Sequence, residues 1–423
     1  MRIAGVFLRD FEPFADQQLE FPAKPEAGLA EVHFFVGQNG SGKTRLLSLL
    51  AAACGNPAEL QFRTDKTSSA VVLDSAIEGK TRFTYASTSQ GFQASSRFDV
   101  MYANFAKSPP GPGTSTIQIF DPNKDVAMAF RSVPSLEDQK VTPMGEVKMG
   151  VRNSFLTFTH HTNESTQICQ GLANLKVRMG IVSSDPKDRT VRMVHAFDEA
   201  IKNITDRDLL LTVGYVRNEF RLKAKWDGQE IQLKQLPDGL RAIVGWLASC
   251  MVKLDMIHPD IDNPLEQPLI LLLDEPDAHL HPAWQRKLIP AVQKLLPNAQ
   301  IFIATHSPFV VSSVNHGWIH VFPADKQGIV NIMPAQPCSQ GDSYVDVVED
   351  ILGVHEQFDP ETEKLLQDFR AQRDDIKKQP KDESRLAEVK TLALKIADRS
   401  QTLSFMMGRE IAQLDAQLKQ IAG

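Results

Sequence analysis

Eight residues near the N-terminus have the types and the spacing of a phosphate-binding loop. In chain order they are Gly37, Gln38, Asn39, Gly40, Ser41, Gly42, Lys43 and Thr44. They fit the pattern GxxxxGK[ST] at each fixed position, between an apolar strand pattern and a helical pattern. Glycines let backbone N–H groups converge on phosphate oxygens, and the start of the helix favours negative charge. We therefore expect Lys43 to reach the β- and γ-phosphates of a nucleotide and the Thr44 hydroxyl to bind Mg²⁺.

Two carboxylates directly follow the continuous apolar run at 269–273. They are Asp274 and Glu275. Ligands of parallel sheets bind at the carboxyl ends of the strands, where these two side chains would lie. We expect Asp274 to hold the Mg²⁺ shell and Glu275 to orient and polarise an attacking water. The alternative is that Asp274 and Glu275 form only a solvated acidic turn after a buried strand. The presence of a phosphate loop in the same chain argues against that alternative.

A histidine follows the next apolar run, at 300–304. His306 lies in the sequence Ala-Thr-His-Ser-Pro, directly after that predicted strand. A lone loop histidine is usually structural. At the end of the strand that follows the Asp274–Glu275 strand, however, His306 is placed to contact the γ-phosphate and to sense its loss.

The elements that must position these residues follow from hydrophobic periodicity and from turn residues. In chain order we predict a strand at 32–36, a helix at 44–53, a strand at 98–102, a Pro- and Gly-rich connector at 109–113, a helix at 189–204, a strand at 209–216, hairpin arms at 220–226 and 230–234, a helix at 240–257, strands at 269–273 and 300–304, and a helix at 283–296.

The C-terminal part of the chain predicts helices. Asp359 and Pro360 have the types of a helix cap and a first-turn residue, and a second helical pattern runs from 383 almost to the end. One apolar stripe follows this second pattern, which favours packing within the chain over a partner surface. Its members are Leu403, Met407, Ile411, Leu414, Leu418 and Ile421.

The motifs at 37–44, at 269–275 and at His306 resemble the Walker A, Walker B and switch-histidine motifs of ABC-type ATPases. The stretches 274–282 and 304–308, together with the opening Phe-Glu-Pro-Phe sequence at 11–14, are similar to the RecF, OLD and SMC branch of that class. The resemblance covers 1–54 and 230–320 well and implies ATP and Mg²⁺ as cofactors.

The fold that this resemblance implies is α/β, a P-loop NTPase with an ABC-ATPase-like sheet core. We expect that core to be split between 1–54, with a β-rich N-terminal lobe, and 230–343. An inserted β/α lobe at 55–229 and an all-helical tail at 344–423, for packing or oligomerisation, complete the expected organisation.

ABC-type ATPases complete their site with an LSGG-like signature from a second subunit. The candidate is the stretch 236–241, in which Asp238 and Gly239 open a helix and would face ATP in trans. Pro237 stands where the family has the serine that touches the γ-phosphate, so we expect slow or conditional hydrolysis. A mere helix cap remains the alternative at this position.

The sequence does not fix the roles of four further residues. Gln167 and Gln170 are the candidates for the family's glutamine loop. His279 and His281 lie two apart in a predicted turn, which could suggest a metal site, but the resemblance implies a loop at the dimer face and we favour that interpretation.

Composition excludes several classes of protein. The chain has 423 residues and a net charge of -6, so nucleic-acid binding would need a local basic patch. Its four cysteines are scattered, which argues against a disulfide framework and for a reducing compartment. No apolar run reaches the ~20 residues of a membrane span, and the N-terminus has the pattern of a strand rather than a signal peptide. We expect a cytoplasmic protein without a membrane partner.

The region at 55–235 lacks the heptads of a coiled-coil arm, and no nuclease module is evident. A compact ATPase with a helical tail is similar to the ATPase components of Septu and retron-linked antiphage systems. The resemblance implies a nucleotide-gated regulator of a separate effector, a nuclease, acting as a homodimer or higher homo-oligomer with an ATP-sandwich interface. The alternative is a RecF-like DNA-repair ATPase, with nucleic acid as partner; a transporter ATPase is disfavoured by the degenerate signature.

Overall fold

The computed structural model describes residues 2–9, 11–23, 28–54, 69–74, 82–87, 126–130, 140–142, 144–147, 164–182, 185–216, 219–338, 344–352, 357–378 and 383–422. The strand expected at 98–102 and the connector expected at 109–113 lie outside these residues. The chain divides into two compact units, Met1–Leu352 and Gly353–Gly423. Among the described helices, none is both long and apolar enough to cross a bilayer.

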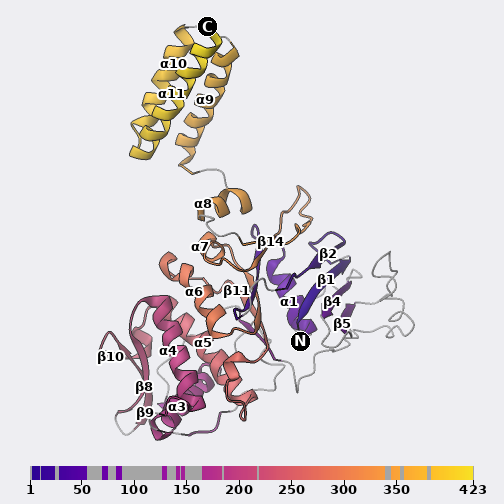
Figure 1. Cartoon of the computed structure of the whole chain (residues 1–423), viewed down its shortest axis with the longest axis vertical. Helices are drawn as coiled ribbons and strands as arrows, with labels where there is room; N and C mark the ends of the chain where they lie inside the picture. The colour runs from indigo at the N-terminus through magenta and orange to yellow at the C-terminus, as the bar shows by residue number, and fades with distance from the viewer. Residues whose placement is uncertain are drawn as a thin grey trace, which may run out of the picture. The chain divides into compact units, whose positions relative to one another are not determined.

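A six-stranded sheet forms the centre of the first unit (Figure 1). Its strand order is β14 (Gln336–Pro337), β13 (Trp318–Val321), β3 (Glu31–Val36), β12 (Ala299–Ala304), β11 (Leu269–Asp274) and β6 (Ala127–Phe130). All neighbours pair in parallel except β13 and β14. Every residue of β3, β11, β12 and β6 is buried, as expected for parallel strands covered on both faces. The strands predicted at 32–36, 269–273 and 300–304 are confirmed.

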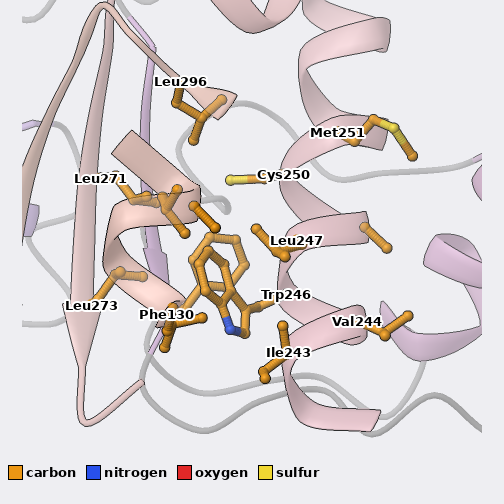
Figure 2. Close-up of a cluster of buried hydrophobic side chains, with 14 of the residues drawn as sticks. Phe130, Ile243, Val244, Trp246, Leu247, Cys250, Met251, Leu271, Leu273 and Leu296 are labelled. Carbon is orange, nitrogen blue, oxygen red and sulfur yellow. The ribbon is translucent and has the colours of Figure 1, made fainter. Parts of the chain in front are cut away.

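Alternate residues of these strands supply two separate cores, because successive side chains point to opposite faces. One face, with Leu272 and Phe302, packs against α1 (Lys43–Ala53) and the N-terminal strands. The other face, with Leu271 and Leu273, packs against α5 (Asp238–Ile257), where Trp246 is 1% exposed (Figure 2). Both layers hold the strand ends at fixed positions.

An antiparallel sheet forms the β-rich N-terminal part. Its order is β2 (Gln17–Glu20), β1 (Ile3–Arg9), β4 (Ser69–Asp74) and β5 (Arg82–Ser87). Strands β4 and β5, like β6 of the central sheet, come from the expected inserted lobe at 55–229. That stretch therefore contributes strands to the central sheet and to the N-terminal sheet.

The remainder of 55–229 forms a third sheet and two long helices. The sheet contains β7 (Lys140–Val141), β8 (Leu209–Val216), β9 (Glu219–Trp226) and β10 (Gln229–Ile231). The helices are α3 (Glu164–Val182) and α4 (Arg189–Thr205). The hairpin and its turn are confirmed, with Asp227 at φ 47° and Gly228 at φ 85°, but the second arm ends at Ile231 rather than at 234. The periodicity did not predict α3, whose Gly171 lies against Val252 and so contributes no side chain to the apolar pattern.

Further helices follow the strands of the first unit. They are η4 (Leu233–Gln235), η5 (Pro264–Glu266), α6 (Pro282–Leu295), α7 (Pro308–Val311), α8 (Tyr344–Asp346) and η6 (Val347–Ile351). Val347 is 1% exposed in the core of the first unit, and the Tyr344 ring lies 5.1 Å from that of Phe309. Burial of Val347 and the ring contact of Tyr344 explain why residues 344–352 belong to the first unit, although we expected the tail to begin at 344.

The second unit consists of α9 (Pro360–Lys378), α10 (Glu383–Ala397) and α11 (Gln401–Ala422). The Asp359 carboxylate accepts from the backbone N–H of Thr362 at 3.1 Å, so the predicted helix start is confirmed. The helical pattern from 383 is interrupted at 398–400, which turns the chain back. Four residues of the predicted apolar stripe are buried in this unit's own core, namely Leu403, Met407, Leu414 and Leu418.

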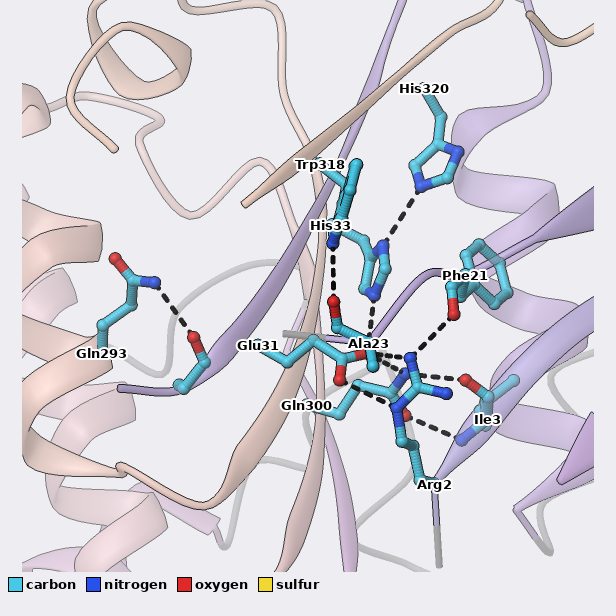
Figure 3. Close-up of polar contacts among 11 residues, drawn as sticks. Arg2, Ile3, Phe21, Ala23, Glu31, His33, Gln293, Gln300, Trp318 and His320 are labelled. Carbon is cyan, nitrogen blue, oxygen red and sulfur yellow. Dashed lines mark hydrogen bonds and ion pairs between the residues drawn. The ribbon is translucent and has the colours of Figure 1, made fainter. Parts of the chain in front are cut away.

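A buried polar network ties the first residues of the chain to the central sheet (Figure 3). The Arg2 guanidinium donates to both oxygens of Glu31, at 2.8 and 2.9 Å. His33 Nε2 lies 2.8 Å from Glu31 Oε1, and His33 Nδ1 lies 3.1 Å from His320 Nε2. Since a carboxylate only accepts, the protons belong on Nε2 of both imidazoles. Nδ1 of His320 then has no partner within the described residues. The network therefore suits two neutral histidines.

Acidification should destabilise the first unit through these histidines. Burial lowers the pKa of His33 and that of His320; the charge of Glu31 opposes the shift at His33, and Arg2 adds to it. The unfolded chain takes up protons on both imidazoles below their ordinary pKa near 6.5, whereas the folded chain resists. The free energy of unfolding is thus highest above that pH and decreases as the pH falls below it. Urea unfolding should show a lower midpoint at about pH 5 than at about pH 7.5.

Two variants separate this effect from general acid sensitivity. His320→Phe should make the urea midpoint less dependent on pH, because it removes one of the two buried imidazoles. His195→Gln, which changes an exposed histidine of α4, should leave the dependence unaltered. Equal midpoints of the wild-type chain at the two pH values would contradict the prediction.

Candidate active site

The loop at 37–44 connects the end of β3 to the start of α1, as the sequence predicted. Gly40 and Gly42 have φ of 80° and 88°, which side chains with a Cβ rarely adopt. Gly42 also packs closely: a Cβ there would lie 2.6 Å from Phe14 Cζ and 2.9 Å from Pro13 Cδ. The Phe-Glu-Pro-Phe sequence at 11–14 thus lies directly against the loop. Its conformation and its packing both require glycine at position 42.

The Lys43 ammonium lies inside this loop. Its Nζ donates to the carbonyl oxygens of Gly37 at 2.8 Å and Gln38 at 2.9 Å. Burial lowers the pKa of Lys43 to about 8, against the charges of Glu275 and Asp274, which raise it. A partly buried cation that contacts only backbone carbonyls is stabilised most by a ligand that brings negative charge. Phosphate oxygens fit that requirement.

Thr44 and Asp274 meet across the sheet, although 230 residues separate them in the chain. The Thr44 hydroxyl lies 3.0 Å from each carboxylate oxygen of Asp274. A hydroxyl and a carboxylate are the hard oxygen ligands that Mg²⁺ prefers, usually together with phosphate oxygens and water. This pair therefore fits the metal that the phosphate loop implies.

Glu275 and His306 face each other beside this pair. His306 Nε2 lies 3.5 Å from Glu275 Oε1, and the Glu275 backbone N–H donates to Ala304 at 2.8 Å. Glu275 has φ of 53°, which costs an ordinary residue of the order of 1–3 kcal/mol. Burial lowers the pKa of His306, the charge of Lys43 lowers it further, and Glu275 opposes both. The imidazole is thus neutral near pH 7, and the Glu275 carboxylate is exposed.

The candidate signature lies where α5 begins. Asp238 is exposed and pairs with Arg241 in the first helical turn, and Pro237 makes no side-chain cap. Gly239 is buried, and a Cβ there would lie 2.7 Å from the carbonyl oxygen of His279. Within the described residues, neither Asp238 nor Gly239 hydrogen-bonds to the cluster around Lys43. The structure thus joins the signature to the loop that follows Glu275, within one copy of the chain.

Two of the residues with open roles, Gln170 and His281, contact other parts of the chain. The Gln170 side chain donates to the Thr142 carbonyl at 2.6 Å and accepts from the Thr142 N–H at 2.9 Å, so it anchors residues near β7. His281 caps α6 by accepting from the Ala283 N–H at 3.2 Å, while His279 is exposed with φ of 65°.

Sequence reasoning gave no role to the side chains that support Glu275 and His306. Asp277 accepts from the Thr305 hydroxyl at 2.7 Å, and Gln285 accepts from the Ser307 hydroxyl at 2.8 Å. Thr305 and Ser307 flank His306 directly, and this adjacency was the only available signal in the sequence. Their partners, Asp277 on the loop after β11 and Gln285 in α6, could be found only from coordinates.

Comparison with known proteins gives short matches. Residues 177–312 match the family model described as "AAA domain, putative AbiEii toxin, Type IV TA system". The chain is 33% identical over 95 residues to "Retron Vc95 probable ATPase" of Vibrio cholerae serotype O1 biovar El Tor, a match of 22% of this chain and 18% of that protein. It is 32% identical over 109 residues to "Septu protein PtuA" of Bacillus thuringiensis, a match of 25% of this chain and 28% of that protein.

Among solved structures, the SMC head bound to the C-winged helix domain of ScpA aligns with a TM-score of 0.43 and 12% identity, over 80% of this chain and 98% of that one. The curated matches span less than a third of each relative's length. They agree with the resemblance carried by the motifs. Over these short stretches the chain is similar to the ATPases of retron and Septu systems, and its central sheet and loop at 37–44 resemble an ABC-like P-loop ATPase core.

Proposed function

We propose that this chain binds and hydrolyses ATP, and that its nucleotide state regulates a partner effector, a nuclease, in bacterial antiphage defence. The observation that carries the ATPase part is the contact between Thr44 and Asp274, with Lys43, Glu275 and His306 around it. The regulatory part rests on the similarity to retron and Septu proteins. We place the protein in the cytoplasm as part of the same proposal.

In this proposal each side chain has a distinct task. Lys43 binds the β- and γ-phosphates, and Thr44 and Asp274 hold Mg²⁺, which would offset charge on the phosphates when bound. Glu275 accepts a hydrogen bond from the attacking water and takes up its proton. The neutral His306 donates from its imidazole N–H to the γ-phosphate once Glu275 turns toward the water.

We propose that a second copy completes the site. Glu275, His279 and Asp238 are exposed on one copy, and the N-terminal end of α5 offers backbone donors to a phosphate of the partner copy. Pro237 has no hydroxyl for the γ-phosphate, so we expect slow or conditional hydrolysis. The homodimer or higher oligomer would form around ATP bound in a sandwich.

A RecF-like DNA-binding ATPase is the second candidate, favoured by one observation. Arg221, Lys223 and Lys225 alternate along β9 on the face opposite to the buried Leu222 and Ala224. Glu219 and Glu230 pair with the first two of these cations, which weakens the patch. Duplex DNA binding by the isolated chain that weakens steeply with salt would favour this candidate.

Co-expression with the product of the neighbouring gene tests the regulatory proposal. We expect the full chain to co-purify with a nuclease and to alter its activity between ATP and a non-hydrolysable ATP analogue. Light scattering should show one assembly that contains both proteins. An unassociated chain whose nucleotide state leaves the nuclease rate unchanged would contradict the proposal.

We also propose that the helices after residue 353 contribute to assembly. Leu394 and Phe405 of this unit are 72% and 71% exposed, unlike the apolar stripe that packs inside it. A chain that lacks 353–423 should form a smaller oligomer by light scattering, and an unchanged oligomer size would defeat this idea.

A further inference from the structure

Four residues next to Glu275 and His306 form a closed ring of hydrogen bonds through their side chains, the Ser307 N–H and the Asp277 carbonyl. Thr305 donates its hydroxyl to Asp277 Oδ1 at 2.7 Å and accepts from the Ser307 N–H at 2.9 Å. Ser307 donates its hydroxyl to Gln285 Oε1 at 2.8 Å. Gln285 completes the ring with its amide, which donates to the carbonyl oxygens of Asp277 and Leu280, both at 3.2 Å.

Three of the four ring residues are buried, Gln285 is half-buried, and Glu275, which the ring supports, is exposed. Thr305 is fully buried, and Ser307 and Asp277 are 7% and 8% exposed. Burial raises the pKa of Asp277, and the hydrogen bond from Thr305 opposes that shift. A buried carboxylate that loses its donor becomes costly, so Thr305 and Asp277 constrain each other strongly.

The ring joins two loops that hold opposite members of the candidate site. One is the loop at 275–281, which begins with Glu275 and supports Gly239 at the start of α5. The other is the loop at 305–307, with His306 at its centre. Glu275 and His279 both have positive φ, so the first loop is strained at two positions and needs fixed partners to keep its shape.

We propose that Asp277, Gln285, Thr305 and Ser307 act as positioning residues that set the separation of Glu275 from His306. This inference rests on the proposed ATPase function and deepens it. None of the four is assigned a contact with nucleotide. Their effect is on the alignment of the water-activating carboxylate and the γ-phosphate contact, where a displacement of about 1 Å can cost about 100-fold in rate.

The matched pair Thr305→Val and Thr305→Ser tests the hydroxyl. Valine keeps the shape of threonine and removes the donor to Asp277, whereas serine retains the donor. We expect Thr305→Val to lower kcat by about 10- to 100-fold with the Kd for ATP within about 3-fold, because binding depends on Lys43 and Thr44. Thr305→Ser should restore kcat to within about 5-fold of wild type.

The two glutamines of α6 supply a second comparison. Gln293 also donates to two carbonyl oxygens, those of Ala30 and His316, at 3.0 and 3.1 Å. Gln285→Leu should lower kcat as Thr305→Val does. Gln293→Leu removes equivalent bonds away from the two loops, so it should lower the melting temperature and leave kcat near wild type. Comparing them separates positioning from general loss of stability.

Wild-type turnover separates a failure of the proposed ATPase function from a failure of the positioning role. If the wild-type full chain, with its partner present, binds ATP without hydrolysing it, the proposed ATPase function fails and the positioning role fails with it. If the wild type hydrolyses ATP and Thr305→Val and Gln285→Leu hydrolyse it equally fast, only the positioning role is overturned. A fall in ATP affinity that matches the fall in kcat, or no recovery with Thr305→Ser, also overturns it.

Discussion

Lys43→Ala should abolish detectable ATP binding. The Lys43 ammonium lies between the carbonyl oxygens of Gly37 and Gln38, inside the loop that would surround the phosphates. Its removal eliminates the one side-chain cation that the loop at 37–44 contains. We expect the Kd for ATP, measured by calorimetry or by a fluorescent analogue, to rise by about 100-fold or more.

Lys294→Ala is the control for this variant. Lys294 is an exposed lysine in the last turn of α6, so its loss should change the Kd by less than about 2-fold. The melting temperature of the Lys43 variant without nucleotide should show that it still folds. If a folded Lys43→Ala chain bound ATP as tightly as the wild type, the loop at 37–44 would not be part of the ATP site.

Glu275→Gln should retain ATP while hydrolysis stops. Glutamine has the length of glutamate and the same cost at positive φ, but it cannot take up the proton of the attacking water. We expect phosphate release to fall by about 100-fold or more, with the Kd for ATP little changed. ATP should then accumulate on the protein, and light scattering should show a larger fraction of dimer than the wild type has.

Glu266→Gln provides a matched control near the opposite end of the same strand. Glu266 is exposed in η5, before β11 begins, and its change to glutamine should leave turnover intact. Hydrolysis at the wild-type rate by Glu275→Gln would reject Glu275 as the base. Loss of ATP binding in that variant would instead show that Glu275 contributes to the binding of ATP itself and not only to its hydrolysis.

Three of the six strands of the central sheet, β3, β11 and β12, were predictable because each is a local pattern, whereas β6, β13 and β14 were not predicted. Apolar runs at 269–273 and 300–304 are long enough for buried strands, and each ends in polar residues. The turn at Asp227 was predictable for the same reason, since its two residues suffice to adopt positive φ. In contrast, α3 contains Gly171 because Val252 of another helix occupies the adjacent space, a reason that local periodicity does not contain.

The sequence by itself determined which groups are available for chemistry: a phosphate loop ending at Thr44, carboxylates at the end of one strand and a histidine at the end of another. Each of these groups is recognised from residues that are adjacent in the sequence. Only the tertiary structure decided that Thr44 lies 3.0 Å from Asp274 and that Asp277 receives the Thr305 hydroxyl. These contacts depend on strand order and register, with β12 placed between β3 and β11. Those are set by the packing of both faces of the sheet rather than by any local segment.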